Sequence, residues 1–361
     1  AADNDEIGPP LLKPSLCCRN DIGIMRAEVK IREMRDTSHW SMERPNAQGV
    51  SCQNIDWLFF GINVCMANAT LPREAVLVVN VQSRKGEALF QSAQTKLLEA
   101  GITLIAAHAV TDPDQLEGIV RIAVADGAPM VIVGGGDGSL SGTVDALVGT
   151  DCVFAVLPLG TANSFARSLG LPLDLDGAIS AIATGQGCRI DLGMIDDDYF
   201  VNGASLGLSP IIGDTIPHRL KRYLGRLGYL LWAIRCSLHF QAFQLIIEDG
   251  AKTHTLWSTE VRILNGTFHG GVELSQNADV ESGDIIIQAV EGRGLLKLAL
   301  DWCSKFFKLK DRHAHSREFR GRAFRLDTKP SLRICIDGEV LAQTPANVKI
   351  APKAVTVALP G

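Results

Sequence analysis

Between residues 131 and 142 the sequence VIVGGGDGSLSG places an acidic residue inside a glycine-rich turn that follows an apolar run. Because Gly135, Gly136 and Gly138 lack side chains, backbone N–H groups can approach a phosphate closely there, at a strand-to-helix junction whose dipole favours anions. Asp137 would repel that phosphate unless a cation lay between them. The segment from Gly135 to Ser139 is therefore predicted to bind a nucleotide phosphate together with Mg²⁺.

Two familiar phosphate motifs are excluded. The sequence contains no GxxxxGK[ST], so the turn is not a P-loop. Nor does it satisfy GxGxxG, because Gly136-Asp137-Gly138 is followed by Ser139, Leu140 and Ser141, and an acid in the turn suits a dinucleotide pyrophosphate poorly. A dehydrogenase is thus the weakest of the enzymatic interpretations.

Polar residues follow two neighbouring apolar runs in the same way. The segment PLGTANSFARSLG (158–170) offers Gly160, Thr161 and Asn163, and the first apolar run ends at Asn80, before Ser83, Arg84 and Lys85. The carboxyl ends of parallel strands meet at one edge of a sheet, which is where such sheets bind ligands. We therefore expect Asn80 and the two loops to form one nucleotide site.

The elements that position these loops follow from periodicity. Strands and helices alternate up to about residue 198, which predicts a parallel α/β sheet, and the runs beyond are short and β-rich, which predicts an antiparallel sheet or sandwich. The expected strands are 75–80, 102–107, 152–158, 243–249, 258–266, 284–292, 331–339 and 348–361, with a further strand that runs into the glycine loop over 130–139. The expected helices are 86–101, 114–125, 144–149, 219–238, 294–307 and one ending at Leu169.

Four segments are expected along the chain. Residues 1–70 lack sustained periodicity and are interpreted as a poorly ordered extension. Residues 71–197 form the nucleotide-binding α/β domain, 198–345 a β-rich substrate domain, and 346–361 a C-terminal segment.

The motifs GGDGS (135–139), PLGTANSFAR (158–167), RIDLG (189–193), FVNGASLG (200–207) and IDGE (336–339), in this order, resemble the diacylglycerol kinase catalytic family, which includes bacterial soluble lipid kinases and the sphingosine and ceramide kinases. The resemblance covers residue 75 to the C-terminus. It implies an α/β domain like that of phosphofructokinases and NAD kinases, a β-sandwich domain across a cleft, and a chain end that returns to the first domain.

The same resemblance implies roles for individual residues. Residues 136–142 would contact the phosphates of ATP, Thr161 the nucleotide, and Asp137 and Asp191 the Mg²⁺ through water. Asp337 and Glu339 would supply the base near the lipid hydroxyl, and Asp137 is the third candidate for it. We expect Asp337 first, because a carboxylate bound to Mg²⁺ is a poor proton acceptor.

At two positions the sequence departs from the family pattern. GTxND ends here in Ser164, which removes a carboxylate from the expected Mg²⁺ water network. AxxxDGxL appears as ADVESGDI (278–285), with Ser282 in place of the aspartate that helps to hold a second, structural Mg²⁺ in some members. Asp279 and Asp284 flank that position and could supply oxygens to a metal, although an acidic turn without metal is the simpler interpretation.

The charge of the chain limits which macromolecules it is expected to bind. The formal net charge is −5, so nucleic acid is not an expected ligand. Residues 305–333 nevertheless hold ten Lys or Arg against three acids, a local net of +7, and a helix over 219–238 has a basic start and an apolar continuation. Both segments could contact an anionic membrane. Alternatively, residues 305–333 form a solvated face, and the helix over 219–238 packs its apolar side on the core.

Location and assembly are expectations only. Nine scattered cysteines and no apolar run of about 20 residues favour a cytoplasmic enzyme with peripheral membrane contact. A homodimer is compatible with the sequence. The function expected is ATP-dependent phosphorylation of a lipid hydroxyl, diacylglycerol or similar. The alternatives are a kinase of the same superfamily acting on NAD or a sugar, and a non-catalytic nucleotide- or lipid-binding protein. His269, in a glycine-rich turn, is given no role.

Overall fold

The computed structural model describes residues 17–20, 23–26, 69–82, 86–250, 252–306 and 316–361. The chain divides into two compact units, residues 1–63 and 64–361. In the first unit the structure describes an antiparallel pair, β1 (Cys17–Asn20) and β2 (Gly23–Arg26). Of the expected N-terminal extension 1–70, the structure describes these two strands and residues 69–70; its other residues lie outside the described ranges, as do Ser83, Arg84 and Lys85.

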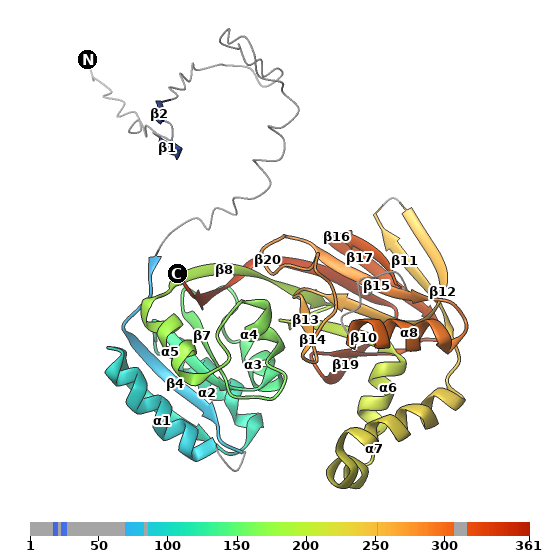
Figure 1. The fold of residues 1–361 in the computed structure, drawn as a ribbon, viewed down its shortest axis with the longest axis horizontal. Coiled ribbons are helices and arrows are strands. Elements are labelled where there is room, and N and C mark those ends of the chain that lie inside the picture. Colours follow the sequence, from blue (N-terminus) through green and yellow to red (C-terminus); the bar gives the residue numbers. More distant parts are fainter. Residues whose placement is uncertain (1–16, 21–22, 27–68, 83–85, 251, 307–315) are drawn as a thin grey trace, which may run out of the picture. The chain divides into compact units, whose positions relative to one another are not determined.

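A parallel sheet forms the first lobe of the second unit, with strands in the order β5-β4-β6-β7 and helices on both faces (Figure 1). The parallel strands are β4 (Glu74–Asn80), β5 (Thr103–Val110), β6 (Met130–Gly135) and β7 (Val153–Pro158). The first lobe also contains the antiparallel strands β3 (Ala69–Thr70), β8 (Gln186–Ile195) and β9 (Asp198–Phe200). Its helices are α1 (Gly86–Glu99), a 3₁₀ turn η2 (Pro113–Gln115), α2 (Leu116–Ala125), α3 (Asp137–Val144), α4 (Ser164–Ser168) and α5 (Leu175–Thr184).

The alternation of side chains along β4 explains the two layers of helices. Val76 and Val78 pack with α2, α3 and α4 in one hydrophobic core, whereas Leu77 and Val79 pack with α1 and α5 in another. Successive strand residues point to opposite faces, so a strand that is apolar throughout must be covered on both sides. The expected α/β domain is confirmed in this sheet.

One expected helix is wrong. The sequence predicted a helix over 144–149, but α3 begins at Asp137 within the glycine loop and ends at Val144, and turns follow it. Gly136 has extended dihedral angles and serves as the N-cap, so the helix starts as soon as the strand ends. Asp137 consequently lies in the first turn of α3.

The second lobe is antiparallel and sandwich-like, as expected. Its strands are β10 (Gly203–Gly207), β11 (Phe243–Asp249), β12 (Lys252–Leu264), β13 (Phe268–His269), β14 (Val272–Glu273), β15 (Ile285–Glu291), β16 (Arg317–Gly321), β17 (Ala323–Lys329), β18 (Arg333–Ile336), β19 (Glu339–Gln343) and β20 (Ala346–Leu359). Strand β12 pairs with β11 along its first half, and with both β10 and β15 after a bulge between Ser258 and Glu260. Phe243, Leu245 and Val261 lie in its core.

Strand β20 belongs to both lobes. It begins antiparallel to β17 in the second lobe, and near its end Thr356 and Val357 pair with β7 in the parallel direction. Strand β8 pairs with β20 in the antiparallel direction along most of the length of β20. The two lobes therefore share hydrogen-bonded strands, and their relative position is set by backbone pairing.

Three further helices lie beside the second lobe: α6 (Leu208–Thr215), α7 (His218–His239) and α8 (Leu295–Phe306). Trp232, Ala233 and Cys236 of α7 pack in one small core with Ile212 of α6 and Leu298 of α8. No helix among the described residues is long and apolar enough to span a bilayer.

Candidate active site

The glycine loop presents a helix N-terminus that no side chain caps. Gly136 caps α3 without a side-chain hydrogen bond, so N–H groups of the first turn remain for a ligand. Asn80 Nδ2 donates to Ser139 Oγ (2.9 Å), which ties the end of β4 to this turn. A Cβ at Gly135 would lie 2.6 Å from the Cβ of Ser139, so the tight turn requires glycine there.

The two loops predicted from the sequence touch through their backbones. A Cβ at Gly160 would lie 2.5 Å from the Cα of Gly136, closer than real Cβ contacts. Asn163, in a left-handed conformation (φ 48°), holds its own loop, because its Oδ1 accepts from Gly160 N (2.9 Å) and its Nδ2 donates to the carbonyls of Pro158 (3.2 Å) and Gly160 (3.1 Å). Thr161 is exposed on that loop. The amide of Asn163 therefore shapes the loop from within.

Asp137 joins the loops and keeps one oxygen available. Its Oδ1 accepts from Phe165 N (3.0 Å), and its Oδ2 has no hydrogen-bond partner in the described part of the chain. Mg²⁺ in phosphotransferases is usually held by one or two carboxylates together with substrate phosphates. Asp137 fits that arrangement. A larger protein cage is absent among the described residues, where no three His, Cys, Asp or Glu side chains are arranged to hold a metal.

Asp337 bridges the two lobes. Its Oδ2 accepts from Val201 N (2.8 Å) and from Ser141 Oγ (2.6 Å), and its Oδ1 accepts from Asn202 N (3.2 Å) and Gly203 N (3.0 Å). One carboxylate thus binds α3 of the first lobe and the start of β10 in the second. With both oxygens engaged, Asp337 is better placed to hold the site together than to accept a proton.

The turn that carries Asp337 explains where Glu339 lies. Ile336 pairs with Glu339, so β18 and β19 are joined by the two residues Asp337 (φ 44°) and Gly338 (φ 106°). Positive φ at both positions is what a type I′ hairpin turn requires, and Asp-Gly is a preferred pair for it. Glu339 follows the turn and is exposed, and its carboxylate accepts no hydrogen bond from the described residues.

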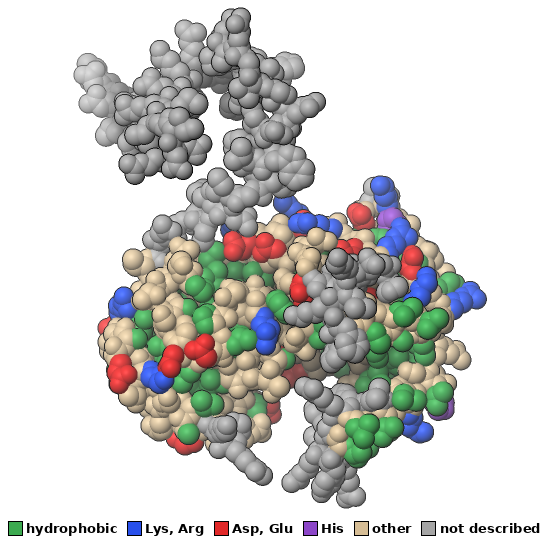
Figure 2. All heavy atoms as spheres, viewed as in Figure 1, with side chains coloured by type: hydrophobic (Ala, Val, Ile, Leu, Met, Phe, Trp, Pro, Cys, Tyr) green, Lys and Arg blue, Asp and Glu red, His purple; other side chains and the backbone are tan. Residues whose placement is uncertain are grey.

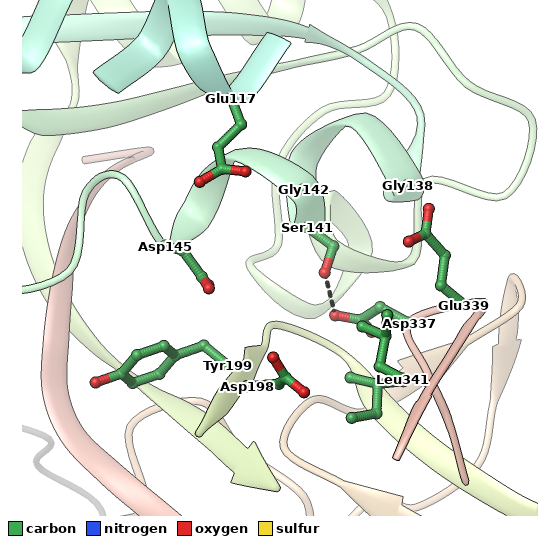
Figure 3. Close-up of a pocket in the computed structure, with 11 residues that line it drawn as sticks. Glu117, Gly138, Ser141, Gly142, Asp145, Asp198, Tyr199, Asp337, Glu339 and Leu341 are labelled. Atoms are coloured by element: carbon green, nitrogen blue, oxygen red, sulfur yellow. Dashed lines mark hydrogen bonds between the residues drawn. The ribbon is translucent and has the colours of Figure 1, made fainter. Parts of the chain in front are cut away.

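Glu339 and the glycine loop line one cavity of about 120 Å³ (Figure 3). Gly138, Ser141 and Gly142 of α3 form one wall, and Glu117, Asp145, Asp198, Tyr199, Ile336, Asp337, Glu339 and Leu341 complete it. Gly135 and Gly136 line a second cavity of about 170 Å³ with Asn80, Gln82, Gly86, Leu89 and Leu159. Neighbouring residues of the glycine motif therefore line two different cavities.

The first cavity is strongly acidic, which the sequence did not indicate. Burial, and then the charges of Glu117 and Asp198, raise the pKa of Asp145 from 3.8 to about 6. These carboxylates come from α2, the end of α3 and β9, with no motif linking them. Ser141 belongs to residues 136–142, for which phosphate contact was expected, but its hydrogen bond to Asp337 was not predicted.

The hairpin of β13 and β14 is clamped onto α4. Ser164 Oγ accepts from Gly271 N (2.9 Å), and Ser168 Oγ accepts from Phe268 N (3.2 Å). Ser164, where the family pattern has aspartate, is 1% exposed, so its hydroxyl is a buried link between the lobes. The hairpin brings His269 within the electrostatic influence of Asp337 and Asp137. Burial lowers the pKa of His269, against the opposing effect of these two charges.

The remaining predicted metal residues lie at a different junction. Asp191 is 3% exposed, and its two oxygens accept from Lys353 N (2.8 Å) in the β20 bulge and from Gly283 N (2.6 Å). Asp284 forms an ion pair with Arg320 (3.0 Å), and Asp279 accepts from Glu281 N (3.0 Å). The structure thus gives these three carboxylates protein partners of their own, and their roles as metal ligands stay predictions.

Comparison with known families gives this geometry a context. Residues 74–195 match the diacylglycerol kinase catalytic domain, and residues 205–359 match the YegS C-terminal NAD kinase beta sandwich-like domain. The chain belongs to the diacylglycerol kinase catalytic family. It is a kinase of the lipid kinase class, with an alcohol acceptor.

Relatives of this lipid kinase extend over both lobes. It is 27% identical to a "Probable lipid kinase YegS-like" of Enterobacter sp. over 81% of this chain and 97% of that protein, and 28% identical to another from Shewanella frigidimarina over 73% and 87%. An uncharacterized Synechocystis protein is 26% identical, and the match spans 56% of its length.

Solved structures show the same fold. The lipid kinase superposes on a crystal structure of a diacylglycerol kinase from Bacillus anthracis with a TM-score of 0.63 and 18% identity, over 80% of this chain and 97% of that one. A second crystal structure from the same organism gives 0.68 and 22%, over 81% and 97%.

Proposed function

We propose that this lipid kinase transfers the γ-phosphoryl group of ATP to the hydroxyl of diacylglycerol or a similar lipid, with Mg²⁺ accompanying the nucleotide. One observation carries the proposal: the free carboxylate Glu339 shares a cavity with the helix end that bears Asp137, and Asp337 ties the two together. An anion site and an unengaged acid on facing elements are what phosphoryl transfer to an alcohol needs.

The two hollows suit the two substrates. The one lined by Asn80, Gly135 and Gly136 would take the nucleotide, with its phosphates directed to the N–H groups of α3. The acidic one would admit the acceptor hydroxyl beside Glu339. Phosphates reaching across the glycine loop from the first hollow would then meet the hydroxyl in the second.

The chemical step can be written with the residues of this chain. The lipid oxygen forms a bond to the γ-phosphorus while the bond from that phosphorus to the β–γ bridging oxygen breaks, and ADP leaves. The hydroxyl proton passes to an Oε atom of Glu339. When bound, Mg²⁺ would neutralise phosphate charge, and Asp137 would hold it. Asp337 positions Glu339 by fixing the hairpin against Ser141 and β10.

The proposal is tested with labelled ATP and Mg²⁺ against a panel of lipid alcohols in mixed micelles, with NAD and a sugar phosphate as soluble acceptors. We expect label in an organic-extractable phospholipid. Labelling of only the soluble acceptors would refute the lipid substrate, and nucleotide binding without any transfer would identify a binding protein instead.

A further inference from the structure

Helix α7 carries a second apolar face that no described part of the chain covers. Its inner face holds Trp232, Ala233 and Cys236, which pack toward α6 and α8. Five large apolar residues recur every three or four positions on the outer face, with exposed fractions of 41, 54, 49, 53 and 78%: Leu224, Leu227, Leu231, Ile234 and Leu238. We call these five the α7 stripe.

Helical geometry separates the two faces. Residues spaced by three and four positions share one side of a helix, so the α7 stripe forms a single row. The packed residues lie on the opposite side, since 232, 233 and 236 fall between the stripe positions. Trp232 Nε1 donates to Thr215 Oγ1 (3.0 Å), which fixes α7 to α6 in this orientation. The row is therefore a surface feature of the folded chain.

Helix α8 also exposes large apolar residues. It shares the small core with α7, yet Leu296 and Leu300 are 74% and 44% exposed. Figure 2 shows apolar side chains gathered over this part of the second lobe. An exposed apolar surface of several large residues on two neighbouring helices is a mark of an interaction site.

Charge identifies the partner. Helix α7 contains five Lys or Arg, namely Arg219, Lys221, Arg222, Arg226 and Arg235, and no Asp or Glu. This contrasts with the net charge of −5 for the whole chain. Apolar residues combined with cationic ones suit an anionic lipid bilayer.

We propose that the α7 stripe, with Leu296 and Leu300, docks this enzyme on an anionic membrane surface. The inference rests on the proposed function, since a lipid substrate is what the enzyme would meet there. The docking helix is connected to the active site through β10, because α6 and α7 follow β10 in the chain, and the backbone N–H of Gly203 at the start of β10 donates to Asp337. The leucines would enter the headgroup boundary, and the basic residues would contact lipid phosphates.

The test is co-sedimentation of the full chain with vesicles of phosphatidylcholine alone and of phosphatidylcholine with phosphatidylglycerol. The variant is Leu227→Glu with Leu231→Glu, whose side chains already face outward. The matched control is Leu98→Glu with Ile122→Glu, exposed by 58% and 63% on α1 and α2. We expect binding to the anionic vesicles that falls at high salt, and at least about tenfold weaker binding for the α7 variant only.

Three outcomes would overturn the inference: wild-type protein that binds neither vesicle, an α7 variant that binds as wild type does, and control substitutions that weaken binding equally. A wild-type dimer on size-exclusion chromatography that the α7 variant converts to monomer, with vesicle binding unchanged, would assign the stripe to a second copy of the chain.

Turnover of a short-chain diacylglycerol in neutral detergent separates this inference from the proposed function. Leucine-dependent vesicle binding without such turnover would reject the lipid kinase reaction and leave the docking surface intact.

Discussion

Replacing Asp337 and Glu339 by their amides separates the two carboxylates of the IDGE turn. Asparagine tolerates the positive φ of position 337, so Asp337→Asn changes the hydrogen bonds with little backbone strain. Its amide nitrogen must face either the N–H of Val201 or the N–H groups of Asn202 and Gly203. In both orientations at least one backbone donor loses its acceptor.

The magnitude follows from that loss. An unsatisfied donor costs about 1–3 kcal/mol, and the bonds that remain lose the strength that a charged acceptor gave them. Because Asp337 is partly solvated, we take a total of about 2 kcal/mol, which lowers the Tm of a unit of the size of residues 64–361 by about 3 °C. Glu339→Gln removes no hydrogen bond described for the folded chain, so its stability should change by less than about 0.5 kcal/mol.

For activity the order is reversed: Glu339→Gln should act directly on the chemical step, and Asp337→Asn indirectly. Glu339→Gln should reduce kcat by about 10²–10⁴, the range for a lost general base, with the KM for ATP little changed. Asp337→Asn should reduce kcat and Tm together, because it loosens the hairpin that positions Glu339. The assays are thermal unfolding by circular dichroism and steady-state kinetics with a lipid alcohol in micelles. An Asp337→Asn protein with wild-type Tm and very low kcat, beside a fully active Glu339→Gln, would refute this reasoning and make Asp337 the base.

Further predictions test the loops and the acidic cavity. Asp137→Asn should abolish turnover at saturating Mg²⁺ with an unchanged circular dichroism spectrum, because the amide oxygen can still accept from Phe165 N; near-normal activity would reject its role. Gly160→Ala should weaken ATP binding at least about tenfold by calorimetry, since its Cβ would meet the backbone of Gly136, whereas Gly138→Ala, with open space around its Cβ, should affect binding much less; equal effects would argue against loop contact. The raised pKa of Asp145 means that the folded state holds its proton more tightly between pH 3.8 and about 6, so this contribution to stability is lost as pH rises through 6. Asp145→Asn should therefore raise Tm at neutral pH and not near pH 3.5, and a Tm difference that is the same at both would contradict the assignment.

The sequence by itself determined the strands that carry the site, although not the start of α3. The apolar runs ending at Asn80, Gly135 and Pro158 are all strands of one parallel sheet, because a strand buried on both faces needs apolar residues throughout. The glycine loop was equally readable, since a turn that admits phosphate requires residues without side chains. The sandwich-like second lobe and the family followed from local patterns and motif order.

What each polar side chain bonds was decided by the tertiary structure. Asp337 meets residues more than a hundred positions away, Asn163 turns back on its own loop, and Ser164 supports a hairpin from the other lobe. For Asp337 and Ser164, nothing near them in the sequence encodes such partners. The distinction between Asp337 and Glu339, two positions apart in one motif, depends on which of them faces β10. Local composition sets the preferences of strands and turns, whereas contacts between distant segments exist only once the lobes have packed.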